Sequence, residues 1–116
     1  MKIGTDIVNI QRIEKSIEKF GDKFKEKFLN PDEILQSKRI ESIAGKWAAK
    51  EAISKALGCG ISAELSFHDI HLSKDKRGAP HFTLSDKAQA IHAIKASSLS
   101  ISHDGGFAIA VVAITQ

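Results

Sequence analysis

Hydrophobic and polar residues follow two different periodicities along the first 30 residues. Residues 1–8 alternate weakly between two faces, which predicts a strand. Between residues 10 and 20 the hydrophobic positions lie three or four apart, which predicts a helix that ends at Gly21. Phe24 and Phe28 repeat the helical spacing, so a second, short helix is expected to follow.

One long helix is predicted at the centre of the chain. The segment Asn30-Pro31-Asp32-Glu33 is a strong helix start, because it combines a capping residue, a proline at the first helical position and a glutamate three residues after the cap. The long helix is expected to run from about Ser37 or Arg39 to Leu57, and Gly58 is suited to end it.

The second half of the chain predicts mainly strands. Segments 66–73 and 80–84 flank a turn-rich stretch and read as a hairpin, and Ser85 is placed to start a helix. Segments 99–103 and 107–114 are joined by an Asp-Gly-Gly turn, and the last of them is hydrophobic on both faces, as a central strand would be. This order of elements predicts an α+β fold, with an antiparallel sheet packed on one long helix plus shorter helices.

Composition sets the class of protein without identifying a function. The chain has 116 residues, enough for one modest core, so residues 1–116 are expected to form a single domain. A lone cysteine, Cys59, cannot form an internal disulfide, which favours a cytoplasmic location. No hydrophobic run reaches membrane-spanning length, so no membrane partner is expected. The net charge of +3 weakly favours anionic partners.

The long helix carries a carboxylate among hydrophobic residues. Its apolar face is defined by four residues: Ile40, Ala44, Trp47 and Ala48. Glu51 falls in the middle of that arc, and Lys55 stands four residues on, on the same face. A carboxylate that faces a core is costly unless it is paired or binds a metal ion. Two interpretations are open from the spacing alone: a Glu51–Lys55 pair at the margin of the apolar face, or a functional carboxylate.

A second feature of the same helix is a group of cations. Arg39, Lys46 and Lys50 fall within about 40° of one another around the helix axis. Such a ridge could hold phosphate groups, although a solvated ridge is the commoner explanation. A nucleic-acid-binding module is a rival interpretation, but the chain has no tyrosine and a single tryptophan for base stacking.

Three segments resemble the motifs of a known enzyme family. Residues 3–13, which begin Ile-Gly-Thr-Asp, residues 45–58, which contain Trp-Ala-Ala-Lys-Glu-Ala, and residues 100–104, Ser-Ile-Ser-His-Asp, occur in the family's order and spacing. Residues 65–70 and 78–80 also match. The chain therefore resembles bacterial holo-[acyl-carrier-protein] synthases, the short, single-domain type of 4′-phosphopantetheinyl transferase.

The resemblance implies a reaction. These enzymes transfer the phosphopantetheine arm of coenzyme A to a serine of apo-acyl carrier protein, in support of fatty acid biosynthesis, and release adenosine 3′,5′-bisphosphate. It implies Mg²⁺ bound by Asp6 and Glu51, since Mg²⁺ takes one or two carboxylates together with substrate oxygens. Glu51 would accept the serine proton, directly or through a metal-bound water. Lys55 would stabilise the phosphate or the leaving group, and its simpler role is to neutralise Glu51.

The same resemblance assigns three binding residues and an assembly. Lys46 and His103 match positions that contact coenzyme A, as does Lys55, and Arg12 matches a position that docks the acidic carrier protein. Lys46 stands where the family commonly has arginine, so it would act as a point charge. The resemblance also implies a homotrimer whose active sites lie at the subunit interfaces. A Mg²⁺-dependent phosphohydrolase that uses the same two carboxylates is a second rival interpretation.

Overall fold

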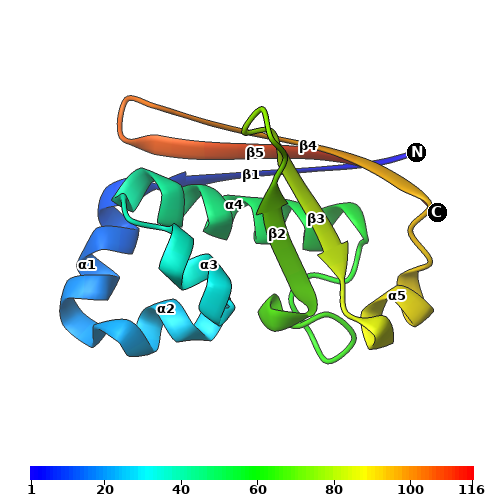
Figure 1. Cartoon of the computed structure of the whole chain (residues 1–116), viewed down its shortest axis with the longest axis horizontal. Coiled ribbons are helices and arrows are strands. Elements are labelled where there is room, and N and C mark those ends of the chain that lie inside the picture. The colour runs from blue at the N-terminus through cyan, green and yellow to red at the C-terminus, as the bar shows by residue number, and fades with distance from the viewer.

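The two ends of the chain pair with each other in a computed structural model that describes residues 1–116. Strand β1 (Lys2–Asn9) is antiparallel to β5 (Phe107–Thr115), and β5 is antiparallel to β4 (Ala96–Asp104), which gives a sheet in the order β1-β5-β4 (Figure 1). Gly105 and Gly106 connect β4 to β5 with φ angles of 58° and 86°, the conformation that a two-residue hairpin loop requires. The prediction that the last strand is central is confirmed.

Four helices follow the first strand. The predicted first helix and the short one after it are α1 (Ile10–Phe20) and α2 (Asp22–Phe28), and the predicted helix start at residues 30–33 begins α3 (Pro31–Gln36). The long helix is α4 (Ile40–Ala56). Figure 1 shows α4 running along one side of the sheet, with no element on the other side.

A second sheet and a short helix complete the fold. Strands β2 (Ile70–Lys74) and β3 (Pro80–Leu84) form an antiparallel hairpin that is separate from the first sheet. The predicted strand from residue 66 was wrong at its start, because Ser66 caps a 3₁₀ turn, η1 (Phe67–Asp69). Helix α5 (Asp86–His92) begins after Ser85 as predicted.

Hydrophobic residues from both sheets and the helices form one core of 22 buried side chains. Trp47, on α4, packs against the rings of Phe24, Phe28 and Phe67, which supports the core role expected of it. The α+β fold with an antiparallel sheet on one long helix is confirmed. None of the helices is long and apolar enough to cross a membrane.

The side of the first sheet that faces away from α4 is hydrophobic and exposed. Strands β1 and β5 contribute five large side chains to it: Ile3, Ile7, Phe107, Ile109 and Val111. Their exposed fractions run from 42% to 66%. A contiguous apolar surface of this kind marks an interaction site.

Candidate active site

Strand β1 and helix α4 bring three charged residues together on one flank of the helix. Asp6 lies two residues from each of the buried residues Gly4 and Val8, so its side chain is on the same face of the strand as theirs, toward α4. Lys55 donates a hydrogen bond from Nζ to Asp6 Oδ1 at 2.8 Å. The interpretation that pairs Glu51 with Lys55 is therefore wrong, because the partner of Lys55 is Asp6.

Glu51 lies beside this pair and has an unusual electrostatic environment. Burial raises the pKa of Glu51, the nearby Asp6 carboxylate raises it further, and Lys55 lowers it in opposition. Two carboxylates thus share one flank with a single ammonium group. The excess of negative charge on this flank attracts a further cation.

The approach of β1 to α4 depends on Gly4. A Cβ atom added there would lie 2.0 Å from the carbonyl oxygen of Ala52 and 2.7 Å from the backbone nitrogen of Ala56. Neither neighbour is a flexible side chain. The missing side chain therefore lets the strand lie directly on the helix, and it places Asp6, two residues on, beside Glu51 and Lys55.

A cleft of about 570 Å³ lies on another flank of α4. One wall comes from the start of α4, the second from the β2–β3 hairpin and the third from β4. Four basic side chains line it: Arg39, Lys46, Lys74 and His103. A cleft lined by cations is suited to an anionic ligand such as a phosphate ester.

Lys46 is the most buried of the four cations. It is 8% exposed and donates to Ser42 Oγ at 3.1 Å. Burial lowers the pKa of Lys46, and Lys74 lowers it further. An anion in the cleft would relieve this repulsion, which is a physical reason for Lys46 to bind one.

The predicted cation ridge does not exist as a single surface. The Arg39 side chain is 80% exposed, whereas that of Lys50 is completely buried and pairs with Glu33 at 2.7 Å. Lys46 contributes to the cleft and Lys50 does not. The solvated-ridge interpretation is wrong, because Glu33 of α3 and the carbonyl oxygen of Phe67 in η1 cover Lys50.

The charged flank and the cleft do not meet within one chain. Lys46 and Glu51 are five residues apart, which turns their side chains about 140° from each other around the helix. In the sheet, Asp6 pairs with Ala110 on one side of β5, whereas His103 pairs with Ala108 on the other. The structure therefore brings Asp6, Glu51 and Lys55 together, and separately Lys46 and His103.

The remaining predicted residues lie elsewhere. Arg12 is exposed on α1, outside both the cleft and the carboxylate flank. His92, on α5, is 7% exposed and its Nε2 atom has no hydrogen-bond partner. Sequence reasoning missed Lys74, for which a turn-rich segment offers no signal, and Glu33, which it treated only as a capping residue.

The donor set also limits which metal ion the chain could hold. No three or more His, Cys, Asp or Glu side chains gather into a metal-binding group. Asp6 and Glu51 alone would leave most coordination positions to water and substrate, which is the pattern of Mg²⁺. The two carboxylates therefore fit a substrate-bridged Mg²⁺ ion, and they do not fit a metal that needs a complete protein cage.

Comparisons with known proteins identify the class to which this fold and site belong. A model of the 4′-phosphopantetheinyl transferase superfamily matches residues 2–112. The chain therefore belongs to the 4′-phosphopantetheinyl transferase superfamily.

Particular relatives narrow the class. The chain is 61% identical to a holo-[acyl-carrier-protein] synthase of Sulfurovum sp. over 98% of this chain and 96% of that protein. It is 57% identical to the protein of the same name in Aliarcobacter butzleri, over 95% and 93% of the two chains. It also resembles the crystal structure of Helicobacter pylori holo-[acyl-carrier-protein] synthase in complex with coenzyme A. That likeness has a TM-score of 0.94 and 53% identity, and it covers 97% of this chain and 99% of the other.

Proposed function

We infer that this chain transfers the 4′-phosphopantetheine arm of coenzyme A to a serine of apo-acyl carrier protein. The products are holo-acyl carrier protein and adenosine 3′,5′-bisphosphate. The observation that carries this function is the full-length likeness to a relative crystallised with coenzyme A, together with a cationic cleft and the neighbouring carboxylates of Asp6 on β1 and Glu51 on α4.

Coenzyme A would bind through its phosphate groups in the cleft. Lys46 is held by Ser42 at one wall, His103 projects from β4 at another, and Lys74 completes the basic lining. Point charges and a planar imidazole near one another suit the separated phosphates of a nucleotide. The nucleotide end of coenzyme A would lie here, and its pyrophosphate would extend out of the cleft toward the carboxylates.

Asp6 and Glu51 would hold Mg²⁺ together with the pyrophosphate. When bound, the ion would neutralise charge on the pyrophosphate oxygens. Lys55 already donates to Asp6 and would keep that carboxylate oriented. It would also present an ammonium charge near the leaving phosphate.

Glu51 is the proposed general base. In the reaction the serine oxygen forms a bond to the phosphorus that carries the pantetheine arm, and the bond from that phosphorus to the bridging oxygen breaks. The hydroxyl proton goes to Glu51, and the electron pair leaves with adenosine 3′,5′-bisphosphate. Burial of Glu51, which raises its pKa in the absence of a metal ion, favours the protonated form that this step produces.

The separation of the two half-sites supports a shared active site. Because Asp6 and His103 of one chain lie on opposite sides of β5, the cleft of one subunit would face the carboxylates of the next. The exposed hydrophobic face of β1 and β5 supplies a surface on which subunits could associate. We propose a homotrimer with three such sites.

The remaining parts of the proposal concern partner and setting. Residues 1–116 would act as one domain. Arg12, exposed on α1, would dock the acidic carrier protein through its charge. The reaction would take place in the cytoplasm and support fatty acid biosynthesis, without nucleic-acid or membrane partners.

One assay separates this function from its rivals. The protein is incubated with coenzyme A, Mg²⁺ and apo-acyl carrier protein, and the carrier is weighed by mass spectrometry. A transferase gives a carrier heavier by one phosphopantetheine arm. A phosphohydrolase consumes coenzyme A without any carrier, and a binding module changes neither molecule.

Two variants then test the carboxylates. Asp6→Ala and Glu51→Gln should each abolish transfer while the far-ultraviolet circular dichroism stays that of the parent. Near-normal transfer by Glu51→Gln at saturating Mg²⁺ would contradict both its metal role and its base role.

A further inference from the structure

A completely buried ion pair joins α4 to α3. Lys50 Nζ lies 2.7 Å from Glu33 Oε1, and both side chains are 0% exposed. Lys50 also donates to the carbonyl oxygen of Phe67 at 3.0 Å. Replacing such a pair by hydrophobic residues is often neutral for stability. Stability alone therefore does not explain why a chain of this size buries two charges.

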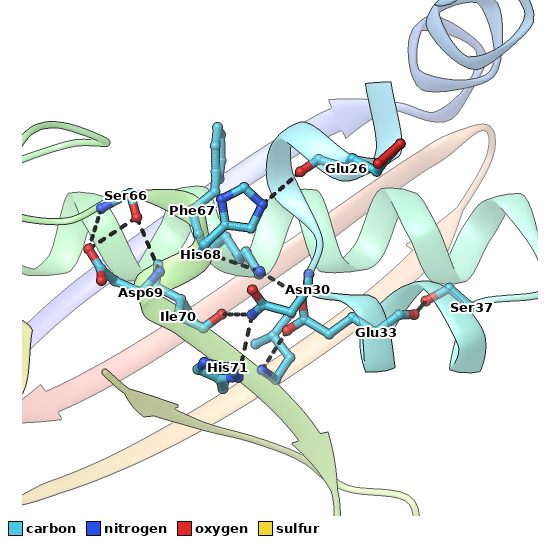
Figure 2. A network of polar contacts seen from close by, with 12 residues as sticks. Glu26, Asn30, Glu33, Ser37, Ser66, Phe67, His68, Asp69, Ile70 and His71 are labelled. Atoms are coloured by element: carbon cyan, nitrogen blue, oxygen red, sulfur yellow. Dashed lines mark hydrogen bonds and ion pairs between the residues drawn. The ribbon is translucent and has the colours of Figure 1, made fainter. Parts of the chain in front are cut away.

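The second carboxylate oxygen of Glu33 reaches a different element. Glu33 Oε2 accepts a hydrogen bond from the backbone N–H of Leu72 at 2.8 Å, and Asn30 donates from Nδ2 to the carbonyl oxygen of Ile70 at 3.2 Å. Figure 2 shows Glu33 and Asn30 turned toward the strand that carries Ile70 and His71. Both contacts are made with strand β2.

These contacts occupy the free edge of β2. The strand pairs with β3 alone, so the backbone groups along its other edge have no strand to bond. Buried backbone groups need partners. Side chains from the start of α3 supply those partners and take the place of a third strand.

The tethered strand forms a wall of the cleft. Two residues from its end, Ser73 and Lys74, line the cleft directly after Leu72. The facing wall is the start of α4, where Lys46 lies one helical turn before Lys50. The Lys50–Glu33–Leu72 connection is therefore a continuous link between the two walls.

We propose that Glu33 and Lys50 are positioning residues that fix the β2–β3 hairpin relative to α4 and so set the affinity of the cleft for coenzyme A. The proposal rests on the proposed function for the identity of the ligand. Neither residue touches the ligand: Lys50 anchors Glu33 to the helix, and Glu33 holds β2 at the distance that the phosphates require.

The decisive variant removes both charges without leaving one unpaired. In E33L/K50M, hydrophobic side chains of similar size replace the pair, so no buried charge is left unpaired and the chain should fold. Its melting temperature should be lower than that of the parent, because the backbone N–H groups of Asn30 and Leu72 lose the acceptors that Glu33 supplies. The N–H of Leu72 then has no acceptor. We expect the Kd of coenzyme A, measured by calorimetry, and its KM to rise about tenfold. The kcat at saturating coenzyme A and the KM for the carrier should stay within about twofold of the parent.

A matched variant keeps the tether. E33Q/K50M also lacks both charges, but the single amide oxygen of glutamine can still accept from Leu72, at the expense of the Asn30 N–H from which Glu33 Oε1 accepts in the parent. Its Kd for coenzyme A should be closer to that of the parent than to that of E33L/K50M. A purely structural role would lower the melting temperatures without separating the two variants in affinity.

Three results would overturn the proposal: E33L/K50M binding coenzyme A as tightly as the parent, equal weakening in both double variants, or rapid amide exchange at Leu72 in the parent. The exchange measurement needs no variant to fold, because the tether predicts protection of Leu72 in the unliganded parent. A parent that binds coenzyme A but transfers nothing would refute the proposed function while leaving the affinity comparison valid. A parent that does not bind coenzyme A would refute both.

Discussion

Gly4→Ala is the sharpest single change for asking whether strand β1 positions the carboxylates. The added Cβ would lie 2.0 Å from the carbonyl oxygen of Ala52, where a carbon–oxygen contact needs about 3.3 Å. The strand must therefore move away from α4 by roughly 1.3 Å, because both clashing groups are backbone or lie next to it. Overpacking of this kind costs about 3 kcal/mol of the free energy of unfolding.

The displacement should affect transfer more than folding. Asp6 is two residues from Gly4, and its bond to Lys55 is only 2.8 Å long, so a shift of about 1 Å separates the two. A misplacement of that size lowers a rate by about 10²-fold. We expect kcat/KM for carrier modification, measured by mass spectrometry below the melting temperature, to fall by about that factor.

Val8→Ala is the matched control. Val8 lies on the same face of β1 and is 8% exposed, but its truncation leaves a cavity and does not push the strand outward. It should lower the free energy of unfolding by about 2 kcal/mol and leave kcat/KM within about threefold of the parent. Equal loss of activity in the two variants, or full activity in Gly4→Ala, would refute the argument that close packing of β1 sets the site.

Three further predictions test charge and assembly. Glu51→Gln should melt at a higher temperature than the parent at neutral pH in the absence of Mg²⁺. Because the pKa of Glu51 is raised in the folded chain, the parent loses stability as pH rises from the ordinary glutamate pKa through the raised one. A difference in melting temperature that does not shrink toward acid pH would contradict this prediction. Arg12→Glu should raise the KM for the carrier protein several-fold and leave the KM for coenzyme A unchanged, and added salt should reproduce the effect in the parent. Equal changes in both KM values would contradict a docking role for Arg12. Asp6→Ala and His103→Ala, each inactive alone, should regain transfer when the two proteins are mixed, dissociated and reassociated, because some sites then combine two intact halves. If the mixtures stay inactive although mass spectrometry confirms subunit exchange, both residues belong to the site of one chain.

Local patterns were sufficient for most of the fold. The spacing of hydrophobic residues predicted α1, since a buried helical face repeats every three or four residues. For α4 it marked only one of the sides that are buried. The glycine pair after Asp104 predicted the β4–β5 hairpin, because only a few residues adopt the conformation of that loop. The strand start at residue 66 failed for a local reason as well: Ser66 and Asp69 bond to each other's backbone and form a short turn that competes with the strand.

The roles of the site residues depended on the family resemblance and remain predictions, but the residues' positions could be judged against the fold. Glu51 stood out because a carboxylate interrupted the apolar face of its helix. His103 carried no comparable signal in the spacing, and Lys46 stood out only as a member of the expected cation ridge. The cleft that contains both residues is assembled from α4, the β2–β3 hairpin and β4. Those three elements are far apart in the sequence, so no local pattern predicts the cleft.

By itself the sequence determined most of the helices and strands, because neighbours a few residues apart decide them. It did not determine that α4 is also buried on the side of Lys46 and Lys50. Only the tertiary structure decided the partners of the charged groups. Lys55 pairs with Asp6 across 49 residues, and Lys50 with Glu33 across 17. A lysine at helical spacing from other cations has the same pattern whether it is solvated or buried. The difference is made by what packs over it, and here α3 and η1 cover Lys50 with a carboxylate and a carbonyl oxygen that lie far from it in the chain.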